Sequence, residues 1–313
     1  MLHWTDSPGT RPQEVMRIPE SRGFPHSHMP DPVKLLNMLR RATDLCRSTP
    51  GRRGGVVTIE SALDVMVVGD LHGNVPFFRK VLHDGSLAQN PQRHLVLQEL
   101  IHGSSFYPED GGDKSHQLVD LVSALKCQYP DRVHLILGNH ELSELTGRPI
   151  GKNGVMLNDT FRQGIETFYG AHAGKIYESY QALFAALPLA VRTPNRVFLC
   201  HTIPDPIAID RLDLGVLAAD EWTEEAMRRG GTVYAMTWGR NTDPEVVDRF
   251  AAMVDADLFV TGHQPCEEGF RRANHRQLII DGTNPYPTYC LFPARGPVTI
   301  ETLLEGVRVR PTL

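Results

Sequence analysis

The stretch DVMVVGDLHGN, residues 64–74, decides how this chain folds. Its first five residues are mostly apolar, which predicts a buried strand. Gly69 ends this strand, Asp70 and His72 follow it at once, and the residues from 75 to 82 have the spacing of a helix. A strand that runs through a polar loop into a helix is typical of an α/β sheet, where ligand-binding and catalytic side chains collect after the strands.

The rest of the chain repeats this alternation. Strands are predicted at residues 56–59, 94–97, 133–137, 196–200, 257–261, 277–280, 288–292 and 298–303. Helices are predicted at residues 32–45, 118–126 and 243–254, and the region 159–187 is mostly helical. The alternation indicates an α/β fold with one continuous core. Residues 1–31, rich in Pro, Ser, Gly and His, are predicted to be an extended N-terminal arm, which leaves 32–313 as a single domain.

The composition narrows the class of protein. The chain has 313 residues, 41% of them hydrophobic, and a formal net charge of −5, so it lacks the basic character of a nucleic-acid-binding domain. No stretch approaches the roughly 18 apolar residues of a membrane span, and the N-terminus has no apolar signal region. The five cysteines form no CxxC pair and are predicted to be reduced thiols. We therefore expect a cytoplasmic protein with no nucleic-acid or membrane partner.

Five successive predicted strands, at residues 64–68, 94–97, 133–137, 196–200 and 257–261, are each followed by side chains that can bind a metal. A single Gly-Asp or a single histidine at such a place is usually a turn or a structural residue, but the ordered series is difficult to obtain by chance. Divalent ions favour such mixed oxygen and imidazole ligands, and two ions that share a carboxylate can hold both oxygens of a phosphoryl displacement and activate a bridging water as hydroxide. The series is Asp70 and His72, then Glu99 and His102, then Asn139, His140 and Glu141, then His201, then His263.

Four motifs resemble a known family. GDLHGN (69–74), LGNHE (137–141), CHTIP (200–204) and GHQP (262–265) are similar to the motifs of the calcineurin-like metallophosphoesterases, in particular the phosphoprotein phosphatase branch with its bacterial relatives. The similarity runs from about residue 32 to about residue 303. It implies a four-layer α/β/β/α sandwich in which two mixed β-sheets are flanked by helices.

The resemblance also implies a role for each matching residue. Asp70 and His72 would bind one metal, Glu99 stands at the bridging position, and His140 would be the general acid, a task that suits a group titrating near neutrality. Asn139, His201 and His263 would bind the second metal. Arg240 resembles an arginine that grips the phosphate, although a solvated surface charge is an equal reading. Manganese is the metal expected first, and iron, zinc and nickel also suit these ligands.

The second motif departs from the family. It should read Gly-Asp-x-x-Asp-Arg-Gly, but here Glu99 stands at the bridging Asp, His102 at the Asp that orients the catalytic histidine, and Gly103 at a phosphate-binding Arg. The extra methylene of Glu99 would need a displacement of the backbone or of the metal. Asp110 and Asp113, in or beside the insertion that follows, are candidates to replace the lost carboxylate.

Three functions remain open at this point. The first is a metal-dependent hydrolase of phosphomonoesters, with a phosphorylated protein or a small-molecule phosphoester as its substrate. The second is a hydrolase of phosphodiesters or dinucleoside polyphosphates. The third is a catalytically weak metal-binding interaction protein, which the altered second motif suggests.

Overall fold

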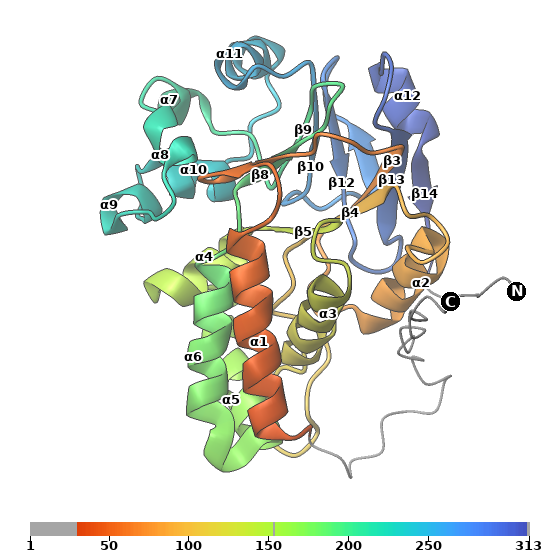
Figure 1. Ribbon diagram of the computed structural model, residues 1–313. Coiled ribbons are helices and arrows are strands. Elements are labelled where there is room, and N and C mark those ends of the chain that lie inside the picture. The colour runs from red at the N-terminus through yellow and green to blue at the C-terminus, as the bar shows by residue number, and fades with distance from the viewer. Residues whose placement is uncertain (1–29, 153, 312–313) are drawn as a thin grey trace, which may run out of the picture.

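Two β-sheets pack face to face, and helices cover their outer faces (Figure 1). A computed structural model describes residues 30–311 with the exception of residue 153. The predicted arm therefore lies outside the described residues, apart from its last two positions. The arrangement confirms the four-layer α/β/β/α sandwich expected from the sequence.

The smaller sheet carries the strand that opens the sequence argument. Its order is β14-β13-β3-β4-β5, with β3, β4 and β5 parallel and β13 antiparallel to β3. The GDLHGN loop follows β3 directly, and β4 and β5 end beside it. The strands are β3 (Asp64–Val68), β4 (Arg93–Gln98), β5 (Val133–Ile136), β13 (Thr288–Pro293) and β14 (Val307–Val309).

The larger sheet has the order β1-β2-β8-β9-β10-β12-β11. Its central strands β9, β10 and β12 are parallel, whereas β8 runs antiparallel to β9. A separate hairpin pairs β6 (Gly151–Lys152) with β7 (Val155–Met156). The strands of the larger sheet are β1 (Arg52–Arg53), β2 (Val56–Thr58), β8 (Ala190–Arg192), β9 (Val197–Cys200), β10 (Leu258–Thr261), β11 (Phe270–Arg272) and β12 (Gln277–Ile280).

Helices α1, α3, α5 and α6 pack side by side below the two sheets, and α3 contacts β5 of the smaller sheet (Figure 1). Asp31 caps α1, because its carboxylate accepts from the backbone N–H groups of Val33 and Lys34, as the Asp-Pro start predicts. The longer helices are α1 (Pro32–Arg47), α2 (Val75–Gly85), α3 (His116–Gln128), α4 (Asn139–Thr146), α5 (Leu157–Tyr169), α6 (Ala173–Phe184) and α11 (Pro244–Val254). The shorter ones are η1 (Gly170–His172), α7 (Pro206–Ile209), α8 (Leu214–Ala218), α9 (Glu224–Met227), α10 (Thr232–Trp238) and α12 (Ile300–Glu305).

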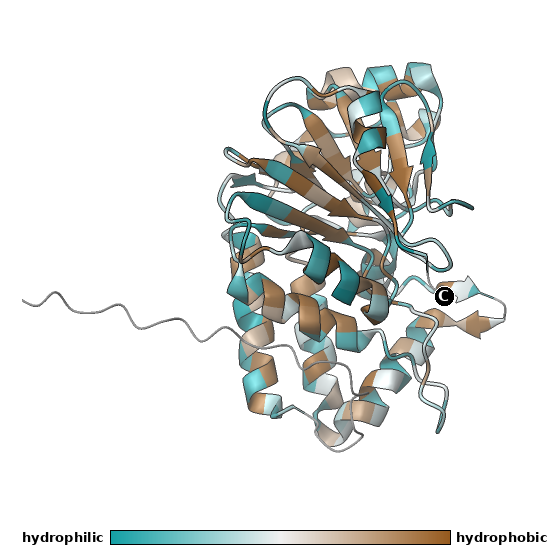
Figure 2. Cartoon of the chain, turned by 90° about the vertical axis from the view of Figure 1, so that its right-hand side faces the viewer, coloured by the Kyte–Doolittle hydropathy of each residue, from teal (hydrophilic) through white to brown (hydrophobic). Residues whose placement is uncertain are grey.

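The central strands of both sheets are buried on both faces, and their hydrophobic colour runs along most of their length (Figure 2). Successive side chains of β3 point to opposite sides. Val65 and Val67 join the cluster between the two sheets, while Met66 and Val68 join the cluster under the helices. Such burial fixes the register, so the residues that follow each strand are held at one edge.

The prediction of a closing strand at residues 298–303 is wrong. This segment forms α12, and Thr299 caps it by accepting from the backbone N–H of Thr302. Ile300 and Leu303 are both buried and lie three residues apart, which is helical rather than strand spacing. The closing strand β14 comes directly afterwards.

Candidate metal centre

The residues predicted to bind metal meet where strands of both sheets end. Asp70 and His72 follow β3, Glu99 follows β4, Asn139 opens α4 after β5, His201 follows β9 and His263 follows β10. Two tight groups of possible ligands form among the described residues. One group is His72, Glu99 and His140, and the other is Glu99, His201 and His263, with the donor atoms of each within 4.8 Å of one another.

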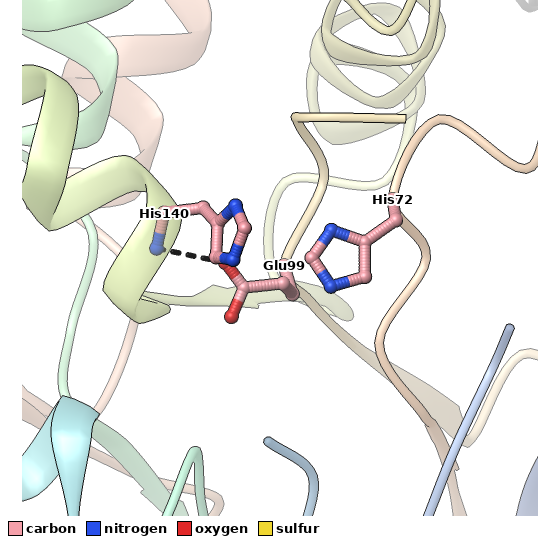
Figure 3. Close-up of side chains that lie close together, drawn as sticks. All are labelled: His72, Glu99 and His140. Carbon is pink, nitrogen blue, oxygen red and sulfur yellow. Dashed lines mark hydrogen bonds between the residues drawn. The ribbon is translucent and has the colours of Figure 1, made fainter. Parts of the chain in front are cut away.

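Glu99 belongs to both groups and lies between them. Figure 3 shows its carboxylate between the rings of His72 and His140, with Oε1 accepting from the backbone N–H of His140 at 2.9 Å. Oε2 lies 2.7 Å from Nε2 of His201, in the second group. The residue is only 1% exposed. A buried carboxylate shared by two ligand groups has the placement that a bridging ligand requires.

The second group is oriented by its surroundings. Nδ1 of His201 lies 3.0 Å from Oε1 of Gln98, which leaves Nε2 to face Glu99 and the side-chain oxygen of Asn139 at 3.0 Å. Metal-binding histidines commonly have one ring nitrogen fixed in this way. Nε2 of His263 is buried and finds no hydrogen-bond partner in the part of the chain that the structure describes.

Asp70 and His72 complete the site from the β3 side. Asp70 lies outside the two tight groups. Its Oδ2 accepts from the backbone N–H of His263 at 2.7 Å, and its Oδ1 lies 3.9 Å from Nδ1 of His201. His72 keeps Nδ1 on the carbonyl oxygen of Ile101 at 2.8 Å, so Nε2 is left for the site.

The donors fit a pair of divalent cations. Asp70 Oδ1 and His263 Nε2 are buried without hydrogen-bond partners among the residues described, and buried polar atoms in native proteins are nearly always satisfied. Ligands bonded to a cation at about 2.1 Å lie about 3 Å from one another, which matches the spacing around His201. The mixed set of carboxylate, amide and imidazole groups suits manganese, iron, zinc or nickel.

The backbone at the site is strained. His72, Glu99 and His263 have φ values of 40°, 50° and 66°, in the left-handed region that side chains other than glycine seldom adopt. Each such residue costs about 1–3 kcal/mol and persists only where the surroundings hold it. At Glu99 this conformation is consistent with the backbone displacement that the longer side chain was expected to need.

The site also depends on a close approach at Gly262. A Cβ there would lie 2.1 Å from Oδ1 of Asp70, so any larger residue would displace the carboxylate. The strand end at β10 therefore requires glycine next to His263.

Burial and neighbouring charges shift the pKa values of the proposed metal ligands. Burial raises the pKa of Asp70 to about 6. Burial alone would lower the pKa of His201, but the carboxylates of Glu99 and Asp70 outweigh it and raise that pKa to about 8. Burial, helped by the charges of His201 and Arg240, lowers the pKa of His263 to about 2, so His263 is neutral as a ligand must be. Cations would replace the protons held by Asp70 and His201, whereas the neighbouring histidines lower the pKa of Glu99 and keep it ionised.

The altered second motif has a carboxylate that sequence reasoning missed. His102 contacts the ring of His140, and Glu144 lies behind His102. Neither Asp110 nor Asp113 takes this place, so that expectation is wrong. Asp113 accepts from the backbone N–H groups of Gly103 and Ser115, while Asp110 accepts from that of Gly112. The sequence does contain a sign of this carboxylate. Glu144 follows His140 by four residues in one helix, so the two side chains share a face of α4.

Gly103 leaves no room for the arginine of the family motif. A Cβ at this position would lie 2.7 Å from the backbone oxygen of His72.

Two other arginines lie on the side of the site that carries His263. Arg240 has an exposed side chain, and its backbone N–H donates to Asp205. Arg148 lies over the ring of Trp238, which is itself 6.4 Å from the ring of His263 between centroids.

The family model for calcineurin-like phosphoesterases matches residues 63–267. The chain belongs to this family. Calcineurin-like phosphoesterases are metal-dependent hydrolases, which agrees with the candidate ligand groups. A probable serine/threonine-protein phosphatase of Encephalitozoon cuniculi is 28% identical over 240 residues, or 69% of this chain and 46% of the relative. The chain thus spans about half the length of that curated relative.

Solved structures share the fold of this calcineurin-like phosphoesterase. A protein serine/threonine phosphatase from Saccharomyces cerevisiae has a TM-score of 0.67 at 14% identity, covering 90% of this chain and 89% of that chain. A cold-active protein tyrosine phosphatase has a TM-score of 0.55 at 15% identity, covering 80% and 78%. At these identities the similarity concerns the fold alone.

No helix within residues 30–311, residue 153 aside, is long and apolar enough to cross a membrane.

Proposed function

We propose that this protein hydrolyses phosphomonoesters with a pair of divalent cations, and that phosphoserine or phosphothreonine in a protein is its substrate. The observation that carries the proposal is the position of Glu99, a buried carboxylate that belongs to both ligand groups, with one oxygen 2.7 Å from Nε2 of His201. The substrate class is supported by the name of the relative from Encephalitozoon cuniculi.

The ligands divide between the two cations around Glu99. Asp70, His72 and Glu99 would hold one cation; the other would be held by Glu99, Asn139, His201 and His263. When bound, the cations supply positive charge that polarises the phosphoryl oxygens and lowers the pKa of water at the site. Manganese is the cation we propose.

His140 is proposed as the general acid. Its Nδ1 faces His102, so its Nε2 is free to donate a proton to the ester oxygen that leaves. As the acid, His140 carries a proton on Nε2 as well as on Nδ1. Burial and the neighbouring histidines lower the pKa of His140 and disfavour this form, whereas the charge of Glu99 favours it. Its backbone N–H holds Glu99, so the acid and the proposed bridging carboxylate are fixed relative to each other.

Arg240 is proposed to bind the phosphate. Its guanidinium is exposed. Burial is the main cause of the lowered pKa of His263, and the positive charge of Arg240 adds to it, so the two residues are near each other. A guanidinium can bind two phosphate oxygens at once. We expect Arg240→Ala to raise KM by about tenfold, which corresponds to one charge-assisted hydrogen bond of about 1.5 kcal/mol. Arg249→Ala, which alters an exposed arginine of α11, is the control.

The proposal is tested by metal content and substrate range together. Purified protein loaded with manganese, iron, zinc or nickel is assayed on p-nitrophenyl phosphate and on phosphoserine and phosphothreonine peptides. Bis-p-nitrophenyl phosphate and a dinucleoside tetraphosphate test the other phosphoester classes. We expect two cations per chain and turnover of the monoesters, abolished by Asp70→Asn but not by Asp44→Asn on the exposed side of α1. Full metal loading without turnover of any substrate would instead indicate a metal-binding interaction protein.

A further inference from the structure

The ring of His140 is held by another histidine. Its Nδ1 lies 2.7 Å from Nδ1 of His102, and the two rings meet at 61° with their centroids 4.9 Å apart. With Nδ1 engaged, Nε2 is the nitrogen left to serve the reaction. The direction in which His140 presents this nitrogen therefore depends on where His102 is held.

His102 is in turn fixed by Glu144. Its Nε2 lies 3.1 Å from Oε1 of Glu144, and neither side chain has any exposed surface. A carboxylate accepts hydrogen bonds and does not donate them, so the proton of a neutral His102 belongs on Nε2. Its Nδ1 then offers a lone pair to the Nδ1–H of His140. The φ of 61° at His102 is a strained value that this network helps to hold.

Glu144 is anchored by two helices besides its own. Asn158 of α5 donates to Oε1 at 2.6 Å, and the hydroxyl of Tyr177 of α6 donates to Oε2 at 2.6 Å. Together with His102, these groups satisfy both oxygens of a buried carboxylate. The carboxylate is therefore a fixed point against which the two histidines are aligned.

We propose that Glu144, acting through His102, is the positioning residue for His140, in place of the carboxylate that the family's second motif would supply directly. This inference rests on the proposed phosphomonoesterase function. In that reaction the bond between phosphorus and the ester oxygen breaks, and its electron pair leaves with that oxygen. The ester oxygen takes the proton from Nε2 of His140 and departs as an alcohol. A water oxygen forms the new bond to phosphorus, and one proton of that water later returns to His140.

The role of Glu144 predicts a dependence on the leaving group. Phenol, with a pKa of about 10, needs the acid more than the better leaving group p-nitrophenol does. We expect Glu144→Gln to lower kcat by about 10²-fold on phenyl phosphate and by less than tenfold on p-nitrophenyl phosphate, since loss of general acid catalysis costs about 10²- to 10⁴-fold. Tyr177→Phe, which removes one donor from Glu144 and is only half-buried, should move the same ratio by a few-fold.

Asp120→Asn is the matched control. Asp120 is also a buried carboxylate held by two tyrosines, Tyr169 and Tyr180, but it lies on α3 away from His140. It should leave the ratio of the two kcat values unchanged. Equal losses on both substrates in Glu144→Gln and in Tyr177→Phe would assign Glu144 a structural role only and overturn the inference.

A second measurement does not depend on turnover. Nitrogen-15 spectra of the histidine rings in the zinc-loaded, full-length protein report which nitrogen carries each proton. We expect His102 to carry its proton on Nε2, with Nδ1 bare, and Glu144→Gln to remove that preference. A proton on Nδ1 of His102 in the unmodified protein, or a spectrum unchanged by Glu144→Gln, would overturn the inference. A failure of the proposed function is recognised separately, because the unmodified protein would then turn over no monoester.

Discussion

The strand ends of this protein differ in how closely they follow the family. The loop after β3 and the start of α4 after β5 carry the family motifs unchanged, whereas the end of β4 between them carries Glu99, His102 and Gly103 in place of two aspartates and an arginine. The central strand still delivers a carboxylate between the two ligand groups and still contacts His140. The comparison teaches that the placement of donors can be kept while the residues at one strand end change.

The largest effect is expected at Glu99. If the end of β4 still bridges two cations, Glu99→Gln removes a charge from both ligand groups. We expect one cation per chain to be lost and kcat to fall by about 10³-fold, because a bound cation contributes several kcal/mol of charge stabilisation. Metal analysis and turnover of p-nitrophenyl phosphate measure the two effects. Glu166→Gln, on the exposed side of α5, is the control, and an unchanged metal content in Glu99→Gln would move the bridge elsewhere.

A smaller loss of kcat is expected from a change at His140, which follows β5 in an unchanged family motif. His140 belongs to one of the two groups of possible ligands, but we propose that it is the general acid. His140→Ala should lower kcat by about 10²-fold or more and leave both cations bound, since general acid catalysis contributes at least that factor. Metal analysis of the same sample separates the two roles. Loss of a cation in His140→Ala would make His140 a ligand and change which strand ends form the cage.

Placing the family's arginine at position 103, after β4, should destabilise this protein and should not create the family's phosphate-binding site. Gly103→Arg places a Cβ 2.7 Å from the backbone oxygen of His72, so we expect a loss of about 1–3 kcal/mol in the free energy of unfolding, as in other overpacked sites. Urea denaturation measures it. Gly111→Arg, at a glycine with nothing near its Cβ position but a φ of 80°, separates crowding from backbone strain. A gain in activity with unchanged stability would contradict the crowding.

The smallest effect concerns pH in the metal-free protein. Folding raises the pKa of His201 and Glu141 to about 8 and that of Asp120 to about 7, so these groups release protons on unfolding between pH 6.5 and 8. Burial lowers the pKa of His94 to about 4 and of His116 to about 3, so these rings take up protons on unfolding near pH 6.5, and this smaller, opposing effect fades by about pH 7.5. The free energy of unfolding should therefore fall as pH rises through this window, by about 1–2 kcal/mol, since one pKa unit corresponds to 1.36 kcal/mol.

The metal-loaded protein should show the opposite trend. Cations bind deprotonated ligands, so their stabilising effect grows with pH. Urea denaturation at pH 6.5 and pH 8, with a chelator or with saturating manganese, compares the two forms. Parallel pH trends in the two forms would mean that His201 and its neighbours do not exchange protons for cations.

Much of the fold was predictable because its strands are apolar on both faces and its helices have clear starts. The strand at residues 64–68 and the Asp31 cap appear as expected. The segment 298–303 begins with alternating apolar and polar residues, as a strand does, and only the spacing of Ile300 and Leu303 and the cap at Thr299 identify it as a helix. The strand β8 has three residues, too few for a periodic pattern to form.

The site was predictable where donors directly follow strands. Asp70, His72, Glu99, Asn139, His201 and His263 all lie at one edge, and their roles remain proposals. Glu144 and Gln98 were missed because each acts through a partner brought close by folding: Glu144 through His102, 42 residues away in sequence, and Gln98 through His201, 103 residues away. Such pairings depend on the packing of elements that a single sequence does not reveal.

The crowding at Gly103 limits how this protein and its relatives can be related by descent. The amide of Gly103 is tied to Asp113, and the space beside its Cα is filled by the loop that carries His72. An arginine introduced at this position therefore lowers the stability of this chain unless the neighbouring loop has changed first. A change in the loop of residues 103–113 that opened this space would reduce the loss, so the fold favours one order of mutational steps over the other.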